Sequence, residues 1–123
     1  MDGSNYSDLN KTWLFDMDGT LVKHNGYKNA GEELLPGVKD FFSKISKDDK
    51  IVILTARSLE YKEITEKFLK ENNIRFDHII YDLPIGERIL FNDKKPSDIH
   101  KPKKLVCCKA YKIPASTNKA KEM

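Results

Sequence analysis

The chain has little cysteine and no long apolar segment. Its two cysteines, Cys107 and Cys108, are adjacent among 123 residues. Adjacent side chains on an extended segment point to opposite faces and do not easily bridge, so they are expected to be reduced thiols. No segment approaches the ~20 apolar residues of a membrane span, and residues 1–6 have no basic and apolar signal pattern. These absences predict a cytoplasmic protein with no membrane partner.

The charge of the chain is modest but uneven. The formal net charge is +3, and the last quarter of the chain is rich in lysine. A lysine-rich end could bind nucleic acid or another anionic substrate, although a solvated surface and a frayed terminus explain it more simply. The lysines are Lys101, Lys103, Lys104, Lys109, Lys112, Lys119 and Lys121.

The length predicts one domain. A chain of 123 residues buries about two-thirds of its unfolded surface and can hold a core without a disulfide. We expect a single domain over residues 1–123, with flexible ends at 1–10 and 115–123. Residues 22–35 are too few for a further domain and predict a short flap.

The most informative segment is Leu14–Leu21, where a short apolar run ends in Asp16 and Asp18. On a strand, residues two apart have side chains on the same side of the backbone. Two carboxylates placed in this way raise each other's pKa by about one unit or more, unless a cation or a proton lies between them. The pair is therefore a candidate for catalysis or metal binding.

Two simpler interpretations of this segment fit less well. A calcium loop with Asp16 and Asp18 at its third and fifth positions puts Leu14 at the first position and Asn25 at the last. The pattern therefore fails at both ends, where the loop needs acidic ligands. A hairpin turn at Asp18-Gly19 needs a matching strand directly after it, whereas residues 22–33 are polar.

The segment Asp16–Thr20, with the sequence DMDGT, resembles the first motif, D-x-D-G-T, of the haloacid dehalogenase (HAD) superfamily of phosphotransferases. The second HAD motif, an apolar strand ending in Thr or Ser, is similar to Ile51–Thr55. This β-branched run predicts a buried parallel strand, and ligands bind beyond the carboxyl ends of such strands. Thr55 is therefore expected to bind phosphate, and Arg57 to bind substrate.

The fourth HAD motif is an apolar strand that ends in an acid pair, and Ile89–Asp93 resembles it. The metal ligand in this motif is usually the second acid, so the resemblance implies that Asp93 binds the metal. Asn92 replaces the first acid, which affects only a supporting contact.

The third HAD motif, a basic residue after the third strand, is missing, because Leu83-Pro84 occupies the expected place. A phosphoryl site without a protein cation lacks a large electrostatic contribution. We therefore expect another basic residue to replace it: Arg88 is the first choice and Lys94 the second, among the candidates Arg57, Arg88, Lys94 and Lys95. Arg88 lies directly at the start of the predicted fourth strand, 89–92, and this could put it at the wrong end of a parallel sheet.

The apolar spacing predicts alternating strands and helices. Their order predicts an α/β fold with a single doubly wound, mostly parallel sheet, a minimal HAD or Rossmann-like core without a cap domain. Only residues 82–88 separate the third and fourth strands, too few for the usual crossover helix. The predicted strands are 12–15, 51–54, 79–81, 89–92 and 105–108, and the predicted helices are 37–45 and 59–71.

The resemblance implies a magnesium-dependent phosphomonoester hydrolase. Asp16 would attack phosphorus and form an aspartyl-phosphate, while Asp18 would act as general acid and base. Mg²⁺ would be held by Asp16, Asp18 and Asp93, with Asp18 contributing its backbone carbonyl. The expected phosphate or substrate ligands are Thr20, Thr55, Arg57, Arg88 and Lys94.

The substrate follows only from family analogy. Small capless HAD proteins that resemble this chain suggest a sugar phosphate or similar small metabolite, in a surface-polysaccharide pathway. A polynucleotide end phosphatase is the alternative, because an open site and a lysine-rich end suit a large substrate. A binding or regulatory module on a catalytically weak HAD scaffold is the second alternative. An open site is also compatible with a homo-oligomer that covers it.

Overall fold

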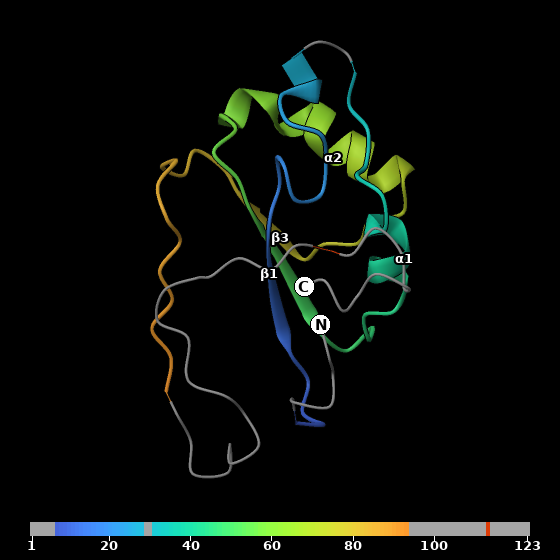
Figure 1. The fold of residues 1–123 in the computed structure, drawn as a ribbon, viewed down its shortest axis with the longest axis vertical. Coiled ribbons are helices and arrows are strands. Elements are labelled where there is room, and N and C mark those ends of the chain that lie inside the picture. Colours follow the sequence, from blue (N-terminus) through green and yellow to red (C-terminus); the bar gives the residue numbers. More distant parts are fainter. Residues whose placement is uncertain (1–6, 29–30, 94–112, 114–123) are drawn as a thin grey trace.

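A parallel three-stranded sheet forms the centre of the molecule (Figure 1). The computed structural model describes residues 7–28, 31–93 and 113. The strands are β1 (Thr12–Asp16), β2 (Lys50–Leu54) and β3 (His78–Ile80), in the order β1-β2-β3. The register pairs Asp16 with Leu54, and Leu54 with Ile80. All three strands therefore end together, at what we call the carboxyl edge; the opposite edge, where they begin, is the amino edge.

Two helices follow the predicted pattern with small changes at their ends. Helix α1 (Val38–Ser43) is shorter than predicted, because the amides of Lys44 and Ile45 bond to carbonyls three residues back, at 3.1 and 3.2 Å, and so close the last turn in a tighter form. Helix α2 (Lys62–Glu71) is preceded directly by the 3₁₀ turn η3 (Leu59–Tyr61).

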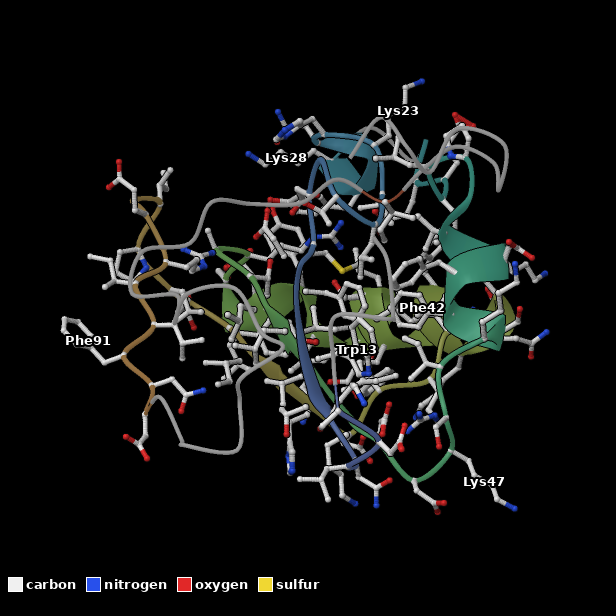
Figure 2. The ribbon with its side chains drawn as sticks, turned by 60° about the horizontal axis from the view of Figure 1, so that its bottom comes forward. Trp13, Lys23, Lys28, Phe42, Lys47 and Phe91 are labelled. Atoms are coloured by element: carbon white, nitrogen blue, oxygen red, sulfur yellow. The ribbon has the colours of Figure 1, made fainter. Side chains whose placement is uncertain are left out.

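The core lies between the sheet and these helices. Phe15, Ile51 and Ile53 of the sheet are buried together with Phe42 of α1 and Leu69 of α2. Each fully buried side chain of this size stabilises the fold by about 1.5–3 kcal/mol. Figure 2 shows the side chains of Trp13 and Phe42 in the interior, between β1 and α1. This burial fixes the register of β1 and so the position of its last residues.

The predicted α/β class, with a parallel sheet and no cap domain, is confirmed in the part of the chain that the structure describes. Neither of its helices, within the described residues, has the length and apolar content to cross a bilayer. The predicted strand 105–108, both cysteines and Lys94 lie outside the described residues.

The predicted fourth strand, 89–92, is wrong. This segment contains one bridge position, Ile89, and no strand. Ile89 and Phe91 are 62% and 81% exposed, and Figure 2 shows Phe91 turned away from the sheet. In Figure 1 the segment 82–93 (yellow to orange) runs from the carboxyl edge back toward the amino edge. A parallel strand requires a crossover of about a dozen residues or more, and residues 82–88 are too few to provide it.

Candidate active site

The chain turns sharply after β1 and leaves two carboxylates at the carboxyl edge. Met17 and Leu21 are completely buried and anchor this turn. The Met17 carbonyl accepts hydrogen bonds from the amides of Thr20, Leu21 and Val22, at 3.2, 2.9 and 3.2 Å. Because Met17 is fixed inside, its neighbours Asp16 and Asp18 are held at the surface of the edge.

Gly19 is required in this turn for two reasons. Its φ of +87° lies in the left-handed region, which favours glycine. A Cβ atom at this position would also lie 2.3 Å from Nε2 of His24. The imidazole of His24, from the flap, therefore lies directly over the turn that carries the carboxylates.

Arg88 reaches Asp16. Its Nη2 lies 3.4 Å from Oδ1 of Asp16, and its Nη1 donates to the carbonyls of Pro84 (2.8 Å) and Gly86 (3.2 Å). Because the segment after β3 is a loop that starts at the carboxyl edge, Arg88 lies at the correct end of the sheet. The structure thus brings together the predicted nucleophile and the first-choice replacement cation.

Asp16 is an unusual carboxylate. Its side chain is 48% exposed, yet partial burial raises its pKa above the ordinary value, while Arg88 and a backbone hydrogen bond act in the opposite direction. The negative charge of Asp16 is therefore incompletely compensated by the protein. A cation brought by a ligand would compensate it.

Arg57 pairs with Asp18 and not with Asp16. Its Nε and Nη2 donate to the two carboxylate oxygens of Asp18, at 3.1 and 2.9 Å. Nη1 and Nη2 donate to the two oxygens of Glu32, at 3.1 and 2.7 Å, and Nη1 also donates to Oγ1 of Thr65 at 2.8 Å. A guanidinium has five N–H donors, so Arg57 has none left for a phosphate oxygen in this structure.

Aromatic packing completes this group, which we call the Arg57 cluster: Asp18, Tyr27, Glu32, Arg57 and Thr65. The Tyr27 ring centroid lies 4.0 Å from Cζ of Arg57, as in a cation–π contact. Burial disfavours the charged guanidinium, but hydrogen bonds to Asp18 and Glu32 raise the pKa of Arg57 above its usual value. Arg57 is therefore a permanent cation with a completely buried side chain.

The flap that carries Tyr27 and Glu32 is joined to the site by backbone bonds as well. Lys23 donates to the Glu33 carbonyl at 3.1 Å, and Leu35 donates to the Leu21 carbonyl at 2.9 Å. In Figure 1 the 3₁₀ turn η2 (Gly26–Lys28, light blue) lies beyond the carboxyl edge, near α2.

Thr55 lies where its motif predicts, at the end of β2, and is 1% exposed. Its Oγ1 accepts a hydrogen bond from the Arg57 amide at 3.0 Å, which leaves the hydroxyl hydrogen to donate elsewhere. Thr20 is partly exposed in the turn after β1. Asp93 is exposed, and its amide bonds to the side chain of its own neighbour, Asn92.

The resemblance implies magnesium, which prefers oxygen ligands in an octahedral arrangement and keeps several waters. The half-exposed Asp16 carboxylate is one such ligand. The Asp18 carboxylate is engaged by Arg57, so its backbone carbonyl is the oxygen that remains. These two donors fit a largely hydrated ion. Within residues 7–28 and 31–93, no three His, Cys, Asp or Glu side chains come together as a metal site, so Asp93 does not join Asp16 and Asp18 in such a group.

Sequence reasoning missed Tyr27, Glu32 and Thr65. Thr65 is completely buried and lies beside the apolar stripe of its helix. A polar residue next to this stripe was the one feature of the sequence that could have indicated a buried polar contact. Tyr27 and Glu32 lie in a polar flap, where no periodicity distinguishes them from solvated residues.

The paired carboxylates, the threonine and the arginine lie beyond the carboxyl ends of the parallel strands, where α/β proteins bind ligands. The chain belongs to the family of NLI interacting factor-like phosphatases, whose model matches residues 11–84. This is a family of the HAD superfamily, so the resemblance to that superfamily is confirmed.

Other comparisons add a structural relative. A chain in a structure of the Pnkp1/Rnl/Hen1 complex is similar, with 25% sequence identity and a TM-score of 0.51. The match covers 62% of the present chain and 29% of that chain. No curated protein matches this sequence.

Proposed function

We propose that this protein is a magnesium-dependent phosphomonoester hydrolase in which Asp16 is the nucleophile. The observation that carries the proposal is the pairing at the carboxyl edge: Arg88 lies 3.4 Å from Asp16, while Asp18, two residues on, is held separately by Arg57. The two carboxylates thus have different partners, as different chemical roles require. Membership of a phosphatase family supports the same reaction class.

In the proposed first step, an Oδ atom of Asp16 bonds to phosphorus as the bond from phosphorus to the ester oxygen breaks. The leaving oxygen keeps the electron pair and receives a proton from Asp18. In the second step, Asp18 takes a proton from water, whose oxygen attacks the aspartyl-phosphate and releases inorganic phosphate and the Asp16 carboxylate. One difficult displacement becomes two easier ones.

The other residues stabilise charge. The guanidinium of Arg88 and the hydroxyl of Thr55 would bind non-bridging phosphate oxygens, with Thr20 and Lys94 as further predicted ligands. Magnesium would supply positive charge that reduces the repulsion between the carboxylate and the phosphate. The Asp16 carboxylate and the Asp18 carbonyl would hold it. Asp93 stays a predicted third ligand, although it does not group with Asp16 and Asp18 among the residues that the structure describes.

For the substrate we propose a sugar phosphate or similar small metabolite, hydrolysed in the cytoplasm. The structural likeness to a chain of the Pnkp1/Rnl/Hen1 complex favours a second candidate, a phosphorylated polynucleotide end. Phosphatase-family membership speaks against the alternative of a purely regulatory module.

The test measures Mg²⁺-dependent hydrolysis of p-nitrophenyl phosphate, phosphorylated sugars and phosphorylated DNA or RNA ends. We expect activity that disappears in Asp16→Asn and is unchanged in Asp48→Asn, a control at an exposed acid. A steep fall of activity with salt on nucleic-acid ends alone would select the second candidate. Activity that survives in Asp16→Asn would refute the mechanism.

A further inference from the structure

The Arg57 cluster joins three parts of the chain that are distant in sequence. Its acceptors are Asp18 after β1, Glu32 in the flap and Thr65 in α2. The Glu32 side chain is only 12% exposed and that of Asp18 only 19%. Both carboxylates share one buried guanidinium.

The geometry of Glu32 is what makes the cluster rigid. A guanidinium that binds one carboxylate in bidentate fashion can still rotate with it, whereas a second bidentate partner fixes its plane. Glu32 supplies that second pair of bonds, at 3.1 and 2.7 Å. Tyr27, from the same flap, lies against the guanidinium, and its ring centroid is 4.8 Å from that of Tyr61.

We propose that Glu32 is a positioning residue of the phosphatase reaction: through Arg57 it fixes the Asp18 carboxylate in the orientation that delivers a proton to the leaving group. This inference rests on the proposed function and adds a residue to it. Glu32 does not touch the reacting atoms. A proton donor displaced by about 1 Å can lose up to about 100-fold in rate, so the second bidentate pair has a direct kinetic consequence.

The leaving group provides a selective readout. Phenolate is a strong base and needs a proton as its bond to phosphorus breaks, whereas p-nitrophenolate is a weaker base and needs it less. Loss of Asp18 positioning should therefore slow phenyl phosphate more than p-nitrophenyl phosphate. A merely structural fault would slow both substrates alike.

The experiment compares kcat and KM of Glu32→Gln with those of Glu33→Gln. Glu33 is the matched control, because it is the next residue of the flap and its pair with Lys23, at 3.5 Å, is 63–64% exposed. In Glu32→Gln we expect kcat on phenyl phosphate to fall about 10- to 100-fold, with less than about threefold loss on p-nitrophenyl phosphate. Both KM values should stay within about twofold of wild type. Glu33→Gln should match wild type on both substrates.

Two results would overturn the proposal: equal losses on both substrates in a folded Glu32→Gln protein, or no loss at all. Should circular dichroism show that Glu32→Gln is unfolded, Glu32→Asp decides, since it keeps the charge but shortens the reach. A selective loss on phenyl phosphate in Glu32→Asp supports the role of Glu32, and wild-type kinetics contradict it. A wild-type protein without Asp16-dependent activity would instead refute the proposed function.

Discussion

The two edges of the sheet use the same residue types for opposite purposes. At the amino edge, Asp49 accepts hydrogen bonds from the Lys11 amide and from Nε1 of Trp13, both at 2.9 Å. These bonds, that of Trp13 first, lower the pKa of Asp49 below its ordinary value. At the carboxyl edge, burial raises the pKa of Asp16, and its cation, Arg88, is 3.4 Å away. One aspartate is satisfied by the fold, and the other is left for a ligand.

The arginines differ in the same way. Arg75, at the amino edge, donates to the carbonyls of Ser46 and Asp49, at 2.9 and 3.2 Å, and its side chain is 39% exposed. Arg75 thus connects the segment before β3 to the segment before β2. Arg57, at the carboxyl edge, is completely buried and binds two carboxylates. Polar side chains that form hydrogen bonds with the main chain stabilise the fold, whereas buried charges that face each other organise a site.

The strongest test of this contrast is Asp16→Asn. Asparagine has no carboxylate to attack phosphorus, so we expect phosphatase activity to fall by at least about a thousandfold. Since burial disfavours the ionised form of Asp16, the melting temperature should not fall. Steady-state kinetics with thermal unfolding in the same buffer measure both. A variant that loses activity because it melts below wild type would contradict the contrast.

Removal of the buried arginine should be the most damaging change to stability. In Arg57→Met the carboxylates of Asp18 and Glu32 lose their shared cation, and we expect a loss of about 3–5 kcal/mol of unfolding free energy. Arg75→Met, the control at the amino edge, removes a partly exposed arginine and should cost about 1 kcal/mol or less. Urea denaturation measures both. Equal costs would show that burial does not distinguish the two arginines.

Asp49→Asn should reverse the outcome of Asp16→Asn. Asparagine keeps one acceptor oxygen, so either the Lys11 amide or the Trp13 indole faces an NH₂ group and loses its bond. We expect a fall of several degrees in melting temperature and unchanged activity per folded molecule. A large change in kcat without a change in melting temperature would show that the amino edge participates in function.

Local pattern predicts the parts of this protein that depend on neighbours in sequence. The apolar run Ile51–Leu54 fixes β2, and with it the place of Thr55, while the spacing of Asp16 and Asp18 identifies the site. The same reasoning failed at residues 89–92, where a strand-like run is too close to β3 to cross over and lies exposed. Arg88 was predicted from the need for a cation near a phosphate, and it lies 3.4 Å from Asp16 although the strand that was expected to carry it is absent.

The Arg57 cluster could not be predicted because its partners are distant in sequence. Glu32 and Asp18 reach Arg57 across separations of 25 and 39 residues. Arg57 was expected to bind substrate, and none of its partners in the structure was predicted from the sequence. Only the folded flap supplies Glu32 and so gives Arg57 a second carboxylate.

The smallest expected effect is a difference in pH dependence between the two aspartates, measured without magnesium in the presence of a chelator. For Asp49, whose folded pKa lies below the ordinary value of 3.8, the stabilising contribution is complete above that value and is lost as pH falls through the folded pKa. For Asp16, whose folded pKa lies above 3.8, the contribution is complete below that value and is lost as pH rises through the folded pKa. The free energy of unfolding of Asp49→Asn should therefore approach that of wild type in acid. That of Asp16→Asn should increase relative to wild type as pH rises. Urea unfolding between roughly pH 3 and 7 covers both windows, and parallel curves for the two variants would remove the electrostatic distinction between the edges.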